Sequence, residues 1–334
     1  MKNHLVLITL IIGYFTSCAG VNHHSNAPNV QFERSKLKTF EELERSIVKI
    51  TCSAFYENYY YNPPADFKGP AVPQQSLLVL KRYTTNSVAG TGLLLCQSSN
   101  RVLVLTCFHL FDFADTLKTF YLDQEKKTTR YLQSLAKKFG QTIYVTHKNG
   151  AISQARIILK DESNDIALIE TEGIPNTLSE LPFQGGFRRK LNLKLGQEVY
   201  LMGFPKGYLM VTRGLVSPTK YKEKFLIDAA FNRGFSGGII FAFDDQTGEY
   251  YYAGMATATA YDSEMTLGPS DSLQNLENFR FAPYTDEVYL KELKLINYGV
   301  TFGVRGDIIV NFLNKEADKL RLMGYGNISR LIRE

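Results

Sequence analysis

Short apolar runs separated by turn residues make up most of this chain. They follow one another at close spacing, as in residues 90–96, 101–107, 165–170 and 238–243. Runs of this length bounded by glycine, proline, asparagine and aspartate are typical of strands in sandwiches and barrels, whereas βα units would alternate with long helical patterns. The pattern therefore predicts an all-β fold.

Some segments depart from this rhythm. Residues 40–50 change from helical to β-branched character, which predicts a short helix leading into a strand. Tyrosines and prolines in residues 53–75 favour an exposed loop. Within residues 112–140 the apolar side chains fall at helical spacing, which predicts a surface helix inserted into the β scaffold, and residues 313–326 suit a closing C-terminal helix.

The N-terminus has the pattern of an export signal. A basic start, an apolar run and small residues lead up to Cys18, and the apolar run is too short to span a bilayer permanently. The residues before Cys18 resemble a bacterial lipobox, so we expect a signal peptide over 1–17 and acylation of Cys18; cleavage nearby with plain secretion is the alternative. Residues 18–38 are polar and suit a flexible tether, which leaves 39–334 as the folded domain.

Composition limits the classes of function. With 334 residues and 44% hydrophobic content the chain can bury a sizeable core. The net charge of +5 is spread among mixed-sign stretches, which gives no support for nucleic-acid binding. After Cys18, the cysteines are Cys52, Cys96 and Cys107, so at most one disulfide can form within the chain, and buried free thiols are equally compatible with the spacing.

The sharpest chemical signal is Ser236, which lies between glycines from residue 234 to residue 238. Glycines allow a tight turn in which the hydroxyl projects into a cleft while neighbouring amides converge on one point. The letters also fit the nucleophile elbow of α/β-hydrolases, but that fold places its histidine after the serine. All five histidines precede Ser236, which excludes the α/β-hydrolase interpretation.

Two further residues complete a nucleophilic site. His109 ends a buried apolar run, whereas His4, His23 and His24 lie in the expected signal or tether and His147 lies beside an Asn-Gly turn. A serine hydroxyl needs an imidazole to accept its proton and a carboxylate to orient that imidazole. Asp165 begins an otherwise apolar strand and requires a partner there. The order His109, Asp165, Ser236 is that of chymotrypsin-like enzymes.

Several ordered motifs resemble the protease domain of the HtrA family of trypsin-like serine peptidases. The resemblance covers the Gly-Thr-Gly segment from Gly90, the Thr-x-x-His ending at His109, the Asp-Ile-Ala-Leu segment from Asp165 and the loop around Ser236, and it extends over about residues 44–316. It implies two six-stranded antiparallel β-barrels, at about 44–185 and 186–316. It also implies His109 as general base, Asp165 as its orienting acid and Ser236 as nucleophile.

The same resemblance implies further details. The backbone amides of Gly234 and Ser236 would form the oxyanion hole. Ala230, Met255 and Ala256 would line the specificity pocket, where the absence of charge favours apolar substrate side chains. Phe235 stands where digestive trypsins carry an aspartate that receives a newly cut amino terminus. Few residues follow Phe312, so the peptide-binding PDZ domain of HtrA proteins is not expected in this chain.

The sequence therefore predicts a serine endopeptidase that acts on proteins or peptides outside the cytoplasm. Neither a cofactor nor a metal site is indicated, and the expected partners are the substrate and the membrane, through the lipid on Cys18. One alternative is a catalytically weak lipoprotein that uses the barrels as a binding or adhesion module. Another is an esterase that uses the same three residues.

Overall fold

The computed structural model describes residues 28–62, 78–122, 128–172, 186–269 and 288–333. The chain divides into a small unit, 1–41, and a large unit, 42–334. Helix α2 (Pro28–Ser46) crosses this division, and strand β1 begins at the next residue. Both barrels and all candidate site residues after Cys18 belong to the large unit. No helix in the described ranges is long and apolar enough to cross a membrane.

The first barrel is a closed sheet of six antiparallel strands. In spatial order these are β1, β2, β3, β7, β6 and β5, and pairing of β5 with β1 closes the ring. Strand β4 (Thr116–Leu122) is added to the outside of β5. The barrel strands are β1 (Ile47–Tyr61), β2 (Leu78–Ser98), β3 (Arg101–Thr106), β5 (Thr128–Thr146), β6 (Ile152–Asp161) and β7 (Ile166–Glu172).

The second barrel has the same construction. Strands β12, β9, β10, β11, β14 and β13 are neighbours in that order, and pairing of β12 with β13 closes the ring. Two short strands, β8 (Phe187–Arg188) and β15 (Ile332–Arg333), extend the sheet beside β13. The barrel strands are β9 (Glu198–Gly203), β10 (Met210–Ser217), β11 (Lys224–Ile227), β12 (Ile239–Asp244), β13 (Glu249–Pro269) and β14 (Val288–Arg305). The prediction of two six-stranded antiparallel barrels is confirmed.

Each barrel has its own hydrophobic core. Strands β3 and β7 lie in the middle of the first sheet, and Leu103, Val104 and Ile169 on them are fully buried. In the second barrel Val199, Ile240 and Phe235 belong to one buried cluster. Such continuous apolar runs bury both faces of a strand, which is why these segments were recognisable in the sequence.

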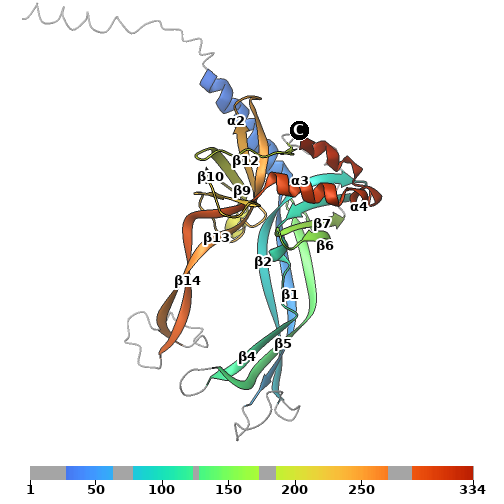
Figure 1. The fold of residues 1–334 in the computed structure, drawn as a ribbon. Coiled ribbons are helices and arrows are strands. Elements are labelled where there is room, and N and C mark those ends of the chain that lie inside the picture. The colour runs from blue at the N-terminus through green and yellow to red at the C-terminus, as the bar shows by residue number, and fades with distance from the viewer. Residues whose placement is uncertain (1–27, 63–77, 123–127, 173–185, 270–287, 334) are drawn as a thin grey trace, which may run out of the picture. The chain divides into compact units, whose positions relative to one another are not determined.

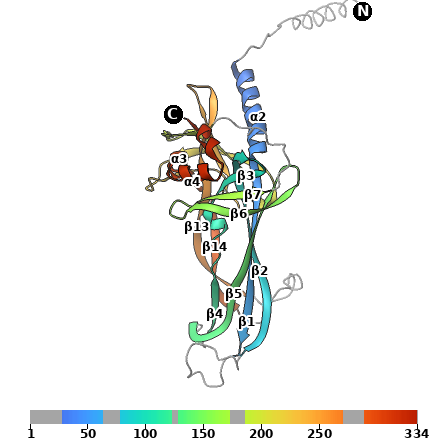
Figure 2. The same ribbon diagram turned by 90° about the vertical axis from the view of Figure 1, so that its right-hand side faces the viewer.

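Several strands continue beyond the barrels (Figures 1 and 2). Strand β1 pairs with both β2 and β5 as far as Tyr60. Strands β13 and β14 continue as a two-stranded ribbon from the Tyr261–Ile296 pair to the Pro269–Val288 pair. A bulge that includes residues 297–300 separates this ribbon from the barrel part of the same strands.

The C-terminal segment contains α3 (Gly306–Lys315), α4 (Ala317–Leu322) and the 3₁₀ turn η5 (Gly326–Leu331). The expected closing helix is thus present as two short helices. The hydroxyl of Tyr325 donates a hydrogen bond of 2.9 Å to the buried carboxylate of Glu170, which also accepts from Arg101 and Arg156. Burial raises the pKa of Glu170, but the Arg156 and Tyr325 hydrogen bonds and the arginine charges outweigh it, so the pKa is lowered.

Three local predictions were wrong. The surface helix expected within residues 112–140 is instead a hairpin of β4 and β5. The part of the expected 53–75 loop that the structure describes continues β1 as far as Tyr61, because β2 and β5 pair with it on both sides. Residues 28–38 of the expected tether belong to helix α2. This helix runs on to Ser46, and Leu43 in its last part is fully buried. Residues 1–27, including Cys18, lie outside the described part.

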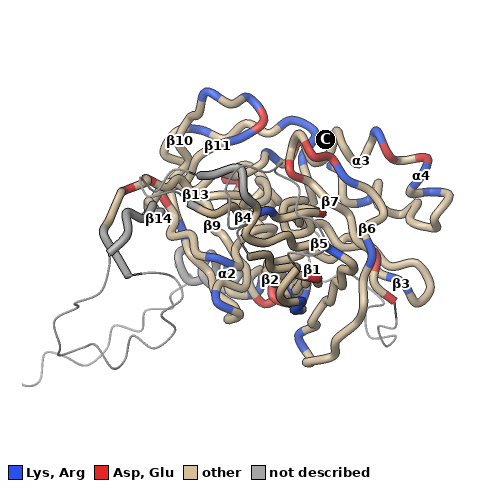
Figure 3. The backbone as a smooth tube through the Cα atoms, turned by 90° about the horizontal axis from the view of Figure 1, so that it is seen from below, with Lys and Arg blue, Asp and Glu red and all other residues tan. Residues whose placement is uncertain are grey.

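Charged positions of the large unit are of mixed sign. Figure 3 shows both basic and acidic residues along α4 and around β10 and β11. Exposed pairs such as Lys319 with Glu316 and Arg321 with Asp318 follow this pattern. The arrangement agrees with the mixed charge distribution of the sequence.

Candidate active site

His109 is presented by a short 3₁₀ turn at the end of a buried strand. Strand β3 ends at Thr106, whose hydroxyl donates a 2.7 Å hydrogen bond to the carbonyl of Thr91 in the neighbouring strand β2. The turn η2 (Phe108–Leu110) follows directly, and Leu110 is buried beneath it. The fully buried strand end and the buried Leu110 fix the backbone, while the His109 side chain stays 44% exposed.

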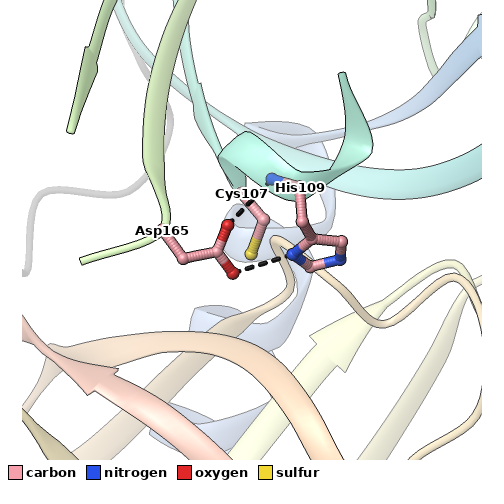
Figure 4. Close-up of side chains that lie close together, drawn as sticks. All are labelled: Cys107, His109 and Asp165. Carbon is pink, nitrogen blue, oxygen red and sulfur yellow. Dashed lines mark hydrogen bonds and ion pairs between the residues drawn. The ribbon is translucent and has the colours of Figure 1, made fainter. Parts of the chain in front are cut away.

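Asp165 lies just before strand β7, in an unusual backbone conformation. Its φ of 58° is in the left-handed region, where aspartate and asparagine are tolerated better than most residues. Its carbonyl accepts from the amide of Phe108 at 3.3 Å. One carboxylate oxygen, Oδ1, accepts from the His109 amide at 2.8 Å, and Oδ2 lies 2.7 Å from Nδ1 of the same residue (Figure 4).

Ser236 lies in the loop between β11 and β12, and its Oγ is 2.9 Å from Nε2 of His109. Gly237 follows with a φ of 82°, and its amide donates to the carbonyl of Ala256 in β13. A Cβ at residue 237 would lie 2.0 Å from the carbonyl oxygen of Thr91, so a larger residue does not fit. Glycine is therefore required at this position for the serine to face the histidine.

The structure thus brings His109, Asp165 and Ser236 together in one hydrogen-bonded row, in which Oδ2 faces Nδ1 and Nε2 faces Oγ. Because an ionised carboxylate only accepts hydrogen bonds, Nδ1 carries the proton and Nε2 is left with a lone pair toward the hydroxyl. An imidazole in this tautomer can take the serine proton as the oxygen attacks a carbonyl carbon.

The loop before Ser236 is anchored by Phe235. Its side chain is 1% exposed and packs in the core of the second barrel, with its ring 6.0 Å from that of Phe231. Burying a phenylalanine contributes about 1.5–3 kcal/mol. Apolar burial therefore holds this loop at the position where digestive trypsins use a charged pair.

The amide of Gly234 is oriented by the peptide that it shares with Arg233. The Arg233 carbonyl accepts a 3.0 Å hydrogen bond from the amide of Lys206, in the 3₁₀ turn η3 (Pro205–Gly207). The peptide is trans, so the N–H of Gly234 points away from Lys206. Within the described ranges no hydrogen bond occupies the amides of Gly234 and Ser236.

Thr91 is a structural residue of the site that the sequence analysis did not single out. Its side chain is fully buried, and Oγ1 donates to the carbonyl of Gly234 at 2.8 Å while accepting from the amide of Phe204 at 2.9 Å. Its amide donates to the carbonyl of Ser236 at 2.8 Å. Thr91 therefore connects the first barrel to the loop of the second that carries Ser236. The Gly-Thr-Gly motif was noticed, but sequence spacing could not show what the threonine contacts.

Cys107 lies beside the carboxylate of Asp165 and the ring of His109 (Figure 4). The thiol is fully buried and donates to the carbonyl of Ala256 at 3.3 Å. Its sulfur, a ring nitrogen of His109 and a carboxylate oxygen of Asp165 all lie within 4.8 Å of one another. Burial, reinforced by the charge of Asp165, raises the pKa of Cys107 well above its ordinary value, so the thiol is neutral.

The residues expected in the specificity pocket are only partly accessible. Ala230 is exposed, but Met255 and Ala256 have 0% exposure. Met255 and Ala256 point to opposite faces of β13, and both faces are covered here because this part of the strand lies within the closed second barrel. The neighbouring Ala258 is exposed and Thr259 is partly exposed. Met255 and Ala256 therefore cannot contact a substrate side chain in this conformation.

The other cysteines and His147 lie outside this cluster. Cys52, Cys96 and Cys107 are all buried and free. Burial raises the pKa of Cys52 to about 11 and that of Cys96 to about 12, so both are neutral side chains of the first barrel. His147 follows β5 at a turn, where burial lowers its pKa.

About half of the chain is similar to a known protein family. Residues 90–250 match the model of the trypsin-like peptidase domain. This part of the chain is similar to trypsin-like peptidases. The match includes His109, Asp165 and Ser236, and it agrees with the resemblance that the sequence motifs carry.

Similar proteins are found among proteases. A probable periplasmic serine protease, do/HhoA-like, from Haemophilus influenzae is 33% identical over 108 residues, which are 29% of this chain and 22% of that protein. A serine endoprotease from Yersinia pestis matches with a TM-score of 0.45 and 16% identity, covering 84% of this chain and 66% of that one. The HtrA-type protease AlgW, solved with a tripeptide, matches with a TM-score of 0.46 and 15% identity. This match covers 84% of this chain and 63% of the AlgW chain.

Proposed function

We propose that this protein is a serine endopeptidase in which Ser236 is the nucleophile, His109 the general base and Asp165 the orienting acid. The observation that carries the proposal is the hydrogen-bonded row of these residues, with 2.7 Å between Oδ2 and Nδ1 and 2.9 Å between Nε2 and Oγ. The match to a trypsin-like peptidase domain supports the same assignment.

The reaction would proceed by acyl transfer. Oγ of Ser236 attacks the scissile carbonyl carbon as Nε2 of His109 accepts the hydroxyl proton, and Asp165 stabilises the imidazolium that forms. The imidazolium then gives this proton to the leaving amine, which departs and leaves an ester on Ser236. A water molecule, activated by the same imidazole, hydrolyses the ester and restores the hydroxyl.

The amides of Gly234 and Ser236 would stabilise the negative oxygen that develops during both steps. Each such donor typically lowers the barrier by about 2.7–4 kcal/mol. The hydrogen bond from Lys206 to the Arg233 carbonyl supports this role, because it keeps the Gly234 amide directed away from η3 without any bound ligand. The bulky Arg233 is exposed and leaves the backbone arrangement intact.

The substrates would be proteins or peptides outside the cytoplasm. A similar protein is described as a probable periplasmic serine protease, and the start of the chain has the pattern of an export signal. Acylation of Cys18 would attach the domain to a membrane of the bacterial envelope. Mass spectrometry of the mature N-terminus tests this step: a diacylglyceryl cysteine is expected, and an unmodified N-terminus at any position would refute it.

Proteolysis is tested on an unfolded protein substrate such as casein. We expect wild type to produce peptides and Ser236→Ala to produce none, because no other group can form the acyl-enzyme. Ser87→Ala, which removes an exposed hydroxyl on β2 that is paired with Ser53, is the matched control and should cleave at the wild-type rate. Cleavage of small esters with intact casein would refute the endopeptidase assignment in favour of an esterase.

A further inference from the structure

The group of Cys107, His109 and Asp165 contains three different kinds of metal ligand. Cys107 offers a sulfur, His109 offers a ring nitrogen and Asp165 offers a carboxylate oxygen, and these atoms lie within 4.8 Å of one another. Figure 4 shows the three side chains converging from the end of β3 and the start of β7. The proposed reaction uses the histidine and the aspartate, but it gives the thiol no task.

This donor set has the chemistry that zinc and cadmium prefer. Both ions are bound by thiolate sulfur, imidazole nitrogen and carboxylate oxygen, with bonds of about 2.0–2.3 Å for zinc. A tetrahedral ion with such bonds places its ligand atoms about 3.3–3.8 Å apart. The present separations bracket this range, because Oδ2 and Nδ1 are 2.7 Å apart and the widest separation is at most 4.8 Å. Shifts of about an ångström would therefore complete three corners of a tetrahedron.

We propose that a thiophilic divalent cation, such as zinc, binds between Cys107, His109 and Asp165 and switches the protease off. The inference rests on the proposed function, because the ion would act by taking a nitrogen that the catalytic histidine needs. The fourth corner of the tetrahedron remains open to water.

The proton balance explains the inhibition. Binding of the ion releases the proton of the Cys107 thiol to solvent. The ion takes the place of the proton on Nδ1 of His109, and the neutral ring carries its one proton on Nε2 instead. Nε2 then donates instead of accepting, so it can no longer take the proton of Ser236. The carboxylate of Asp165 exchanges its hydrogen bond to Nδ1 for a bond to the ion. No oxidant or other reactant is required.

An ion would reach the site past His109. The sulfur of Cys107 is fully buried, whereas the side chain of the neighbouring ligand His109 is 44% exposed. Rotation of this ring would open a path for the ion. The two other buried thiols are natural controls, because the group of ligands in the described part of the chain includes neither Cys52 nor Cys96.

The first experiment measures inhibition of peptide cleavage by zinc chloride, with each variant compared with its own metal-free rate. We expect Cys107→Ser to require at least about tenfold more zinc for half-inhibition, because a hydroxyl is a poor ligand for this ion. Cys52→Ser and Cys96→Ser should be inhibited like wild type. Equal inhibition of Cys107→Ser and wild type would overturn the proposal.

The second experiment does not depend on activity. Cadmium is titrated into full-length Ser236→Ala, and the ultraviolet absorption of a cadmium–thiolate bond is followed. A saturable signal that disappears in Ser236→Ala/Cys107→Ser is expected. No signal, or a signal that persists without Cys107, would overturn the metal site. Failure of the proposed function has a different result: metal-free wild type would cleave no peptide, while the cadmium–thiolate signal of Ser236→Ala would still be observed.

Discussion

Replacing Asp165 by asparagine tests the role of the carboxylate with very little change in shape. Asparagine, like aspartate, tolerates the left-handed backbone at this position, so the variant should fold, whereas an alanine there would add backbone strain. The amide group has one accepting oxygen, but both the His109 amide and Nδ1 now donate to the side chain. One of these two donors must therefore face the NH₂ group.

The energetically better arrangement inactivates the imidazole. The backbone N–H of His109 always donates, so the asparagine oxygen faces it and the NH₂ group faces Nδ1, which then must accept. The ring proton moves to Nε2, and Nε2 can no longer take the proton of Ser236. A wrong tautomer of this kind lowers turnover about 10⁴-fold, which corresponds to ~5 kcal/mol in the barrier.

The assay is the rate constant of peptide hydrolysis at a pH near neutrality, with circular dichroism to establish that the variant is folded. Asp112→Asn is the matched control, because Asp112 is exposed and lies only three residues from His109. We expect the control to stay within about twofold of wild type. A folded Asp165→Asn protein that keeps more than about a tenth of wild-type activity would refute the reasoning about the tautomer.

Two further predictions concern the support of the site and the stability of the fold. Thr91→Val should slow hydrolysis and lower the free energy of unfolding by about 1–3 kcal/mol for each buried group left without a partner. Thr85→Val, at an exposed position, should do neither. A urea midpoint of Thr91→Val equal to that of wild type would contradict this prediction. The pKa of Glu170 is lowered in the folded state, so this carboxylate stabilises the fold at a pH above its ordinary pKa of 4.5, and the stabilisation is lost as the pH falls through the lower folded pKa. Glu170→Gln should therefore lose less stability than wild type over that pH range. An acid dependence of urea unfolding equal to that of wild type would exclude this role of the carboxylate.

The barrels and the row of His109, Asp165 and Ser236 were predictable because their signals are local and strong. Strands such as β3 and β7 are buried on both faces and read as unbroken apolar runs. The histidine after one such run, the aspartate before another and the glycine-flanked serine, in that order along the chain, singled out the residues that the fold brings together. Spacing alone, however, could not supply the distances between them.

The hairpin of β4 and β5 could not be recognised in the same way. The helical spacing was read from Tyr131, Leu132, Leu135 and Phe139, all of which lie on β5. A separation of four residues places side chains on one face of a strand as well as of a helix, so the pattern did not distinguish the two. Pairing with β1, whose own extension to Tyr61 was read as a loop, decides the structure there. Tertiary contacts thus overrode local spacing.

The specificity pocket shows the same limit. Met255 and Ala256 were chosen by their order along the chain, whereas exposure depends on how β12, β13 and β14 close the second barrel. The contacts of Thr91 and the position of Cys107 beside Asp165 likewise arise between strands far apart in sequence.

The central claim, that His109 activates Ser236, is tested most directly with a fluorophosphonate probe and mass spectrometry of the full-length protein. We predict a single adduct on the peptide that contains Ser236, formed rapidly by wild type, about 10⁴-fold more slowly by Asp165→Asn and not at all by Ser236→Ala. An unlabelled wild-type protein, or an adduct on any other residue, would contradict the account.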